Sequence, residues 1–151
     1  QREFWIMMTG LAHLRQDGFA YVTLAQPRRH AQPRKYMAVP KYRAPLQGSL
    51  KTIPIDSSRL DGQTLHVNVE NFAPESAHLS VQVIDAVTGE PITGYRFSDC
   101  HAVGQSSIDH MVTWKDNSCL DGISTDSIRL EFRLFGLLDS PQLYSFLFER
   151  K

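Results

Sequence analysis

The feature that most restricts the fold of this chain is a strict alternation of apolar and polar residues between positions 128 and 134. Apolar Ile128, Leu130, Phe132 and Leu134 alternate with charged Arg129, Glu131 and Arg133. Successive side chains of a β-strand point to opposite faces, so this period of two predicts a strand with one buried face. Similar alternation predicts strands at residues 65–69, 79–83 and 143–148.

Turn residues divide the rest of the chain into further short strands. Segments 49–55, 95–97 and 108–114 contain β-forming residues, and Asp17-Gly18 predicts a hairpin over residues 11–25. No segment has an apolar period of helical length. About eight to ten short strands without helices predict an all-β fold, namely a two-sheet antiparallel β-sandwich of jelly-roll or concanavalin-like type.

The last predicted strand carries large side chains on both of its faces. Simple alternation places Leu143, Ser145 and Leu147 on one face and Tyr144, Phe146 and Phe148 on the other.

The length and charge of the chain indicate one globular unit. The 151 residues suit a single domain, and the 16 basic and 16 acidic residues cancel, which disfavours nucleic acid as a partner. We expect residues 9–151 to form one β-sandwich and residues 1–8 to be the tail of a preceding unit or a first strand. Because the chain begins with Gln1, we expect a piece of a longer or processed protein. No apolar run is long enough for a membrane helix, so no membrane is expected as a partner.

Residues 26–48 differ in character from the segments around them. They contain four prolines and six basic residues, and no acidic residue lies between Asp17 and Asp56. Proline interrupts both helices and central strands, so the sequence predicts a long basic loop at 26–48. Arg28, Arg29 and Arg34, interleaved with tyrosines, are candidates for gripping a polyanion such as an acidic polysaccharide. The alternative is a solvated insertion without a ligand.

The residue types that carry chemistry do not form a recognised catalytic or metal motif. Cys100 and Cys119 are either two half-buried thiols or one disulfide, and no CxxC or HxxxH spacing accompanies them. The aspartates lie mostly in turn contexts, where their side chains bond the local backbone. We therefore expect no catalytic residues, no metal ligands and no cofactor, and we do not expect an enzyme.

A family resemblance covers residues 9 to 149. Three groups of segments carry it in order: the stretch 10–19 (GLAHLRQDGF); then 65–69 (LHVNV) and 79–85 (LSVQVID); then 94–100 (GYRFSDC), 112–115 (VTWK), 128–132 (IRLEF) and 143–146 (LYSF). Together they resemble the C-terminal β-sandwich of glycoside-hydrolase-like proteins, in which it follows a five-bladed propeller. Those proteins are distantly similar to sucrose- and fructan-cleaving hydrolases. The inserted basic stretch and Cys119 depart from the family pattern.

The resemblance implies a role without catalysis, because the catalytic carboxylates of the related hydrolases lie in the propeller. The expected function is a non-catalytic accessory or structural domain of a carbohydrate-related, glycosidase-like protein, with the propeller domain of the parent protein as its partner. The alternative is a free-standing module that binds a glycan or a polyanion. The resemblance also favours an extracellular or secretory location.

Candidate ligand-binding residues follow from the chemistry of sugars. An aromatic ring stacks on the apolar face of a sugar, and fixed polar groups bond its hydroxyls. Trp5, Tyr95, Trp114 and Tyr144 are the candidate rings, although Trp114 at the end of a strand also suits the core. Asp99 and His101 lie in a polar loop that we expect to share one end of the sandwich with residues 116–118.

Overall fold

The computed structural model describes residues 3–7, 11–15, 21–24, 45–72, 76–137 and 141–150. Its strands are β1 (Glu3–Met7), β2 (Leu11–Arg15), β3 (Val22–Thr23), β4 (Leu46–Lys51), β5 (Ile55–Asp56), β6 (Gln63–Glu70), β7 (His78–Asp85), β8 (Ser107–Val112), β9 (Ser127–Gly136) and β10 (Gln142–Arg150). A single 3-10 turn, Ser57–Arg59, is the one helical element among the described residues.

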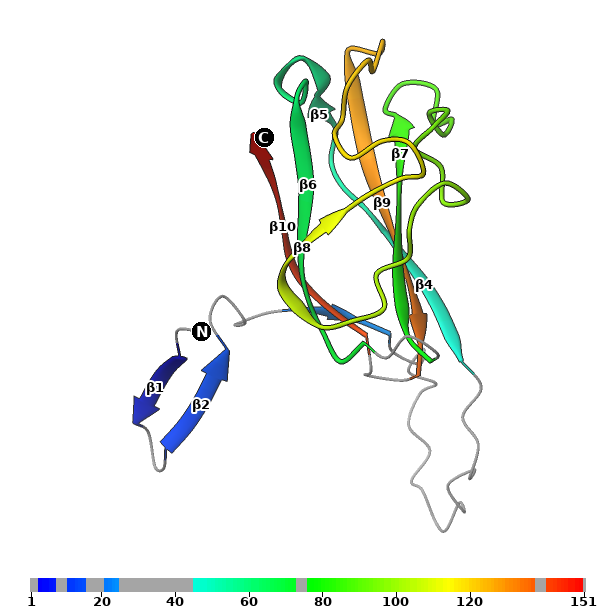
Figure 1. Cartoon of the computed structure of the whole chain (residues 1–151). Helices are drawn as coiled ribbons and strands as arrows, with labels where there is room; N and C mark the ends of the chain where they lie inside the picture. Colours follow the sequence, from blue (N-terminus) through cyan, green and yellow to red (C-terminus); the bar gives the residue numbers. More distant parts are fainter. Residues whose placement is uncertain are drawn as a thin grey trace.

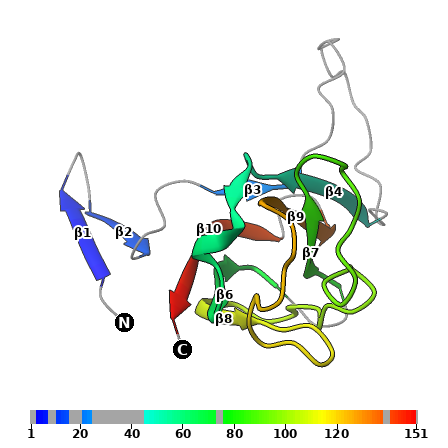
Figure 2. The same cartoon turned by 90° about the horizontal axis from the view of Figure 1, so that it is seen from above.

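Two antiparallel four-stranded sheets pack face to face and form a β-sandwich, which confirms the predicted fold class (Figure 1). One sheet has the order β3-β10-β6-β8 and is called the β6 sheet below. In the other sheet, the β9 sheet, β9 pairs with β4 and β5 along one side and with β7 along the other. The view from above also separates the two layers (Figure 2).

The core lies between the two sheets and is built by alternating residues of each strand. In β9, the even-numbered residues from Ile128 to Gly136 are buried, and the odd-numbered residues are partly exposed. Opposite them, Leu65, Val67 and Val69 of β6 are at most 1% exposed. The sequence alternation therefore predicted the buried face of both central strands correctly.

The connection after β7 shows how local polar groups end a strand. The Asp85 carboxylate accepts hydrogen bonds from the backbone N–H groups of Val87 (2.7 Å) and Thr88 (3.0 Å). Gly89 then adopts a φ of +76°, which a glycine tolerates without the steric cost of a side chain. Aspartate and glycine favour turns for these two reasons.

The predicted pairing of residues 11–25 as one hairpin is wrong. β2 pairs with β1 from Glu3–Arg15 to Met7–Leu11, whereas β3 pairs with β10 of the sandwich. The Asp17-Gly18 turn itself lies outside the described residues. The backbone N–H and C=O groups of β2 are paired with β1, and those of β3 are paired with β10. Local turn signals do not reveal which strand a segment will pair with.

The boundaries of three other predicted segments also change. The strand expected at 49–55 begins at Leu46 and is interrupted before β5, where Pro54 cannot donate to a ladder, so the basic loop cannot extend to residue 48. The strand at 108–114 is one residue longer at its start and ends at Val112. The segment 95–97 forms turns instead of a strand.

A β-bulge in β10 overturns the predicted faces of the last strand. The register shifts between Leu143, which lies opposite Val69, and Ser145, which lies opposite Asn68. One extra residue therefore reverses the alternation. Phe146 lies opposite Val67 and packs on the core residue Phe132, with ring centroids 5.2 Å apart. Leu143 and Phe146 thus share the inner face, although simple alternation separated them.

In the part of the chain that the structure describes, no helix is long and apolar enough to cross a membrane.

Candidate functional site

The outer face of the β6 sheet carries a row of polar side chains along its central strand. The outward-facing residues of β6 are Thr64, His66, Asn68 and Glu70, which alternate with the buried valines and leucine. The neighbouring strands β8 and β10 flank this row on both sides, and Thr64 is only 4% and Asn68 only 6% exposed. Buried polar groups usually have hydrogen-bond partners, and the partners of this row form the candidate site.

His66 is the centre of this row and contacts residues of both neighbouring strands. Its Nδ1 atom lies 2.6 Å from Oδ1 of Asp109 on β8, and its Nε2 atom lies 3.7 Å from Oε2 of Glu149 on β10. Nε2 also lies 3.0 Å from the hydroxyl of Thr64, and that hydroxyl donates to the Glu149 backbone carbonyl. The imidazole is 13% exposed, whereas both carboxylates are more than half exposed. We call His66, Asp109 and Glu149 the His66 cluster.

The positions next to the His66 cluster are less polar. In the register of the sheet, Met111 lies directly opposite His66 on β8, and Leu147 lies opposite it on β10. Both side chains are exposed, at 42% and 50% respectively. On β8, burial lowers the pKa of His110, and the nearby His66 adds to the shift. The exposed side chains of Met111 and Leu147 therefore lie on either side of His66.

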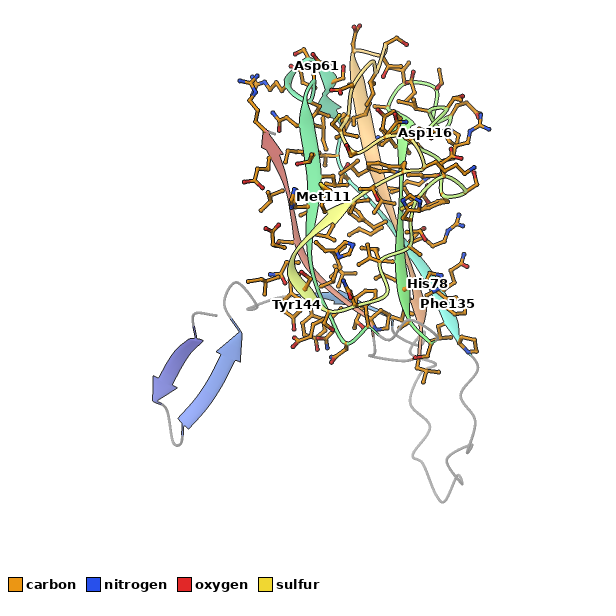
Figure 3. The ribbon with its side chains drawn as sticks, viewed as in Figure 1. Asp61, His78, Met111, Asp116, Phe135 and Tyr144 are labelled. Carbon is orange, nitrogen blue, oxygen red and sulfur yellow. The ribbon has the colours of Figure 1, made fainter. Side chains whose placement is uncertain are left out.

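A second polar and aromatic group lies nearer the β3 end of the same sheet. The rings of Tyr21 and Tyr144 are 5.4 Å apart and tilted, and Tyr21 is 49% exposed. The Tyr144 hydroxyl lies 2.9 Å from both Glu70 Oε2 and Gln142 Oε1. Figure 3 places Tyr144 well away from Met111, which marks the His66 cluster. An exposed ring beside fixed polar groups is the arrangement expected for sugar stacking.

Two of the predicted ligand-binding rings are buried in the core. Trp114 is 1% exposed, and its indole N–H donates to the Val81 carbonyl over 2.9 Å. Tyr95 is 4% exposed, packs edge-on against Trp114, and donates its hydroxyl to the carbonyls of Cys119 and Asp121. Burial raises the pKa of Tyr95. Neither ring offers a face to a sugar, so the alternative that Trp114 is a core residue is confirmed.

Asp99 and His101 lie where the sequence placed them, beside the segment after β8. The backbones pair through Cys100 and Trp114, and Asp99 Oδ1 is 3.1 Å from the Lys115 ammonium. The hydrogen bond from Lys115 lowers the pKa of Asp99. His101 Nδ1 lies 3.0 Å from the Thr113 hydroxyl. Both side chains already hold two loop segments together, which is a structural role.

The two cysteines are thiols, so the disulfide alternative is not realised. The Cys119 thiol lies 2.6 Å from a carboxylate oxygen of Asp121. The Cys100 sulfur accepts a hydrogen bond from the Val81 backbone N–H over 3.3 Å, and burial raises the pKa of this thiol.

The Cys100 thiol is expected to react slowly while the protein is folded, because the thiolate is the nucleophile and burial disfavours it. In a Cys119→Ser variant, its rate of reaction with a disulfide reagent at neutral pH should be at least about tenfold lower in the folded protein than in urea. Equal rates in the two conditions would show that the thiol is open to solvent.

The remaining predicted ligand residues lie outside the described side chains. They are Trp5 and the basic residues Arg28, Arg29 and Arg34. The proposals that rest on them stay predictions.

The sequence did not single out the His66 cluster, and it named Tyr144 as a candidate ring without its partner Tyr21. His66 looked like an ordinary outward residue of an alternating strand, and Asp109 looked like one of many turn aspartates. One sequence signal was available. Polar residues occupy alternate positions of β6, and on a strand in the middle of a sheet the neighbouring strands cover part of such residues.

Comparisons with protein-family models, with curated proteins and with solved structures gave no match.

Proposed function

We propose that this chain is a non-catalytic accessory β-sandwich domain of a carbohydrate-related, glycosidase-like protein. Its expected partner is the neighbouring propeller domain that the sequence resemblance implies. In this reading the domain stabilises or positions its neighbour through one face of the sandwich, and the parent protein's chemistry takes place elsewhere.

The observation that supports a packing role is the uneven distribution of exposed apolar side chains. On the outer face of the β6 sheet, Met111 and Leu147 are 42% and 50% exposed and lie on either side of His66, whereas among the described strands of the β9 sheet only Leu50 is a large exposed hydrophobic residue. Apolar side chains gathered on one sheet are typical of an interaction surface.

The hydroxyl that lies beside His66 also argues against catalysis. Thr64, His66 and Asp109 follow the order of a nucleophile, a base and an orienting acid, with distances of 3.0 and 2.6 Å. However, Thr64 is 4% exposed and its hydroxyl donates to a backbone carbonyl of β10. A buried hydroxyl that is already bonded in the sheet is badly placed to attack a substrate.

The packing face can be tested with a hydrophobic fluorescent dye on the native chain. We expect the dye to bind, and we expect a Met111→Gln/Leu147→Gln variant to lose most of this signal because it removes the apolar pair on the β6 sheet. The matched control is Ile53→Gln/Val87→Gln, since these side chains are more exposed (79% and 87%) but lie on separate loops. An equal loss in the control would overturn the proposal, as would cleavage of chromogenic glycosides by the wild-type chain that His66→Gln abolishes.

The Tyr21–Tyr144 pair favours a second candidate function, a glycan-binding module. A glycan array separates the two functions: binding that Tyr21→Ala abolishes and Tyr21→Phe retains would support sugar stacking on the exposed ring. Absence of binding to neutral and acidic glycans would leave the packing role as the better proposal.

A further inference from the structure

We propose that the His66 cluster binds a divalent transition-metal ion of the Zn²⁺ class on the outer face of the β6 sheet. The proposal is independent of the packing role. It rests on the placement of three donor groups by three adjacent strands, and on a buried amide oxygen at the next outward-facing position of β6.

The backbone holds the three donors close together. His66, Asp109 and Glu149 each offer a ligand atom, and these atoms all lie within 4.8 Å of one another. They come from β6, β8 and β10, which are hydrogen-bonded neighbours in one sheet. Donors on paired strands are positioned more precisely than donors on loops, because the ladder fixes their spacing.

Small movements of the carboxylates convert this geometry into a coordination sphere. Zinc binds nitrogen and oxygen donors at roughly 2.0–2.2 Å, which sets two donors of a tetrahedral site roughly 3.4 Å apart. An imidazole binds one ion through one nitrogen, and the two carboxylates lie at different nitrogens, Asp109 at Nδ1 (2.6 Å) and Glu149 at Nε2 (3.7 Å). One ligand atom from each residue still fits within 4.8 Å, so binding requires one carboxylate to turn toward the nitrogen that the other faces. The side chains of Asp109 and Glu149 are 61% and 62% exposed, so both can adjust while His66 stays fixed.

Asn68 is the second observation that points to a ligand here. It is the next outward-facing residue on β6, it is 6% exposed, and its Oδ1 atom is buried without a hydrogen-bond partner in the described structure. The register shift between Val67 and Val69 places it opposite the part of β8 that carries Asp109. An unsatisfied buried oxygen is costly, and a nearby cation or a water bound to it would remove that cost.

The donor set selects the class of metal. One imidazole nitrogen with two carboxylates suits zinc and similar divalent transition ions. Calcium prefers six to eight oxygen donors, and magnesium retains most of its water, so neither ion profits from the imidazole. We therefore expect Zn²⁺ to bind and Ca²⁺ or Mg²⁺ in excess not to displace it.

The test is calorimetric titration of the whole chain with ZnCl₂ in a Cys119→Ser background, so that the thiol beside Asp121 does not contribute. We expect one saturable site, and we expect His66→Gln to weaken it by at least about tenfold, since even the loss of a supporting group around a metal costs that much. His101→Gln is the matched control, because His101 is also a histidine with a hydroxyl partner but lies in a loop outside the cluster. Its affinity should equal that of the background.

A second variant and a second measurement protect the test against misfolding. Glu149→Gln changes an exposed side chain and should weaken Zn²⁺ binding without lowering the Tm of the metal-free protein. Zn²⁺ should raise the Tm of the background protein because it binds only the folded state, and this rise should be lost in His66→Gln. Binding that is unchanged in both variants, or the absence of a saturable Zn²⁺ site in the background protein, would overturn the proposal.

Discussion

Replacing Trp114 by alanine is expected to lower the free energy of unfolding by about 3–5 kcal/mol, the usual range for removal of a large buried aromatic side chain. The side chain is 1% exposed, so its removal leaves a cavity that neighbouring residues cannot fill without moving. The change also removes the indole donor from the Val81 carbonyl and the edge-on contact with Tyr95. Three sources of stability are therefore lost at one position.

Urea unfolding followed by far-ultraviolet circular dichroism measures this loss without relying on tryptophan fluorescence. Trp114→Phe is the informative companion, because it refills most of the cavity but cannot donate to Val81. Its cost should fall below that of alanine, and the hydrogen-bond part should be about 1–3 kcal/mol. A loss under about 1 kcal/mol for Trp114→Ala would be incompatible with a core position.

The strands that the sequence predicted well are those whose environment differs between their two faces. In β6 and β9 the inner residues face the core and the outer residues face polar surroundings, so burial and sequence period coincide. The β10 strand breaks this rule because the bulge after Leu143 shifts its register. A bulge depends on pairing with β6, and pairing partners are not encoded in the local pattern.

The candidate site was beyond sequence reasoning for a related reason. His66 and Asp109 are 43 residues apart, and they meet because β6 and β8 pair in one register. The segment 99–101 beside the residues after β8 was predictable, because short polar loops next to strand ends gather at one place. The burial of Tyr95 was not predictable, because an aromatic residue in a turn-rich segment gives no local sign that it is buried.

Phe132→Ala is the second change with a large expected effect, again about 3–5 kcal/mol. Phe132 is fully buried on the central strand β9, where it lies between Leu50 of β4 and Val81 of β7. Its ring also reaches the opposite sheet, where the centroid of Phe146 is 5.2 Å away. The side chain therefore supports both the β9 sheet and the contact between the two sheets.

Phe146→Ala is the matched control, because the same residue type at 37% exposure buries less apolar surface and should cost less. The double variant completes a cycle whose coupling energy reports the contact between the two rings, and we expect about 0.5–1.5 kcal/mol. A coupling near zero would contradict direct packing of the rings across the sandwich. If Phe146→Ala costs as much as Phe132→Ala, the Phe146 side chain is covered more fully than its exposure indicates. Burial of this sheet in a complex with a second copy would then explain the cost, and dilution of the protein should reduce it.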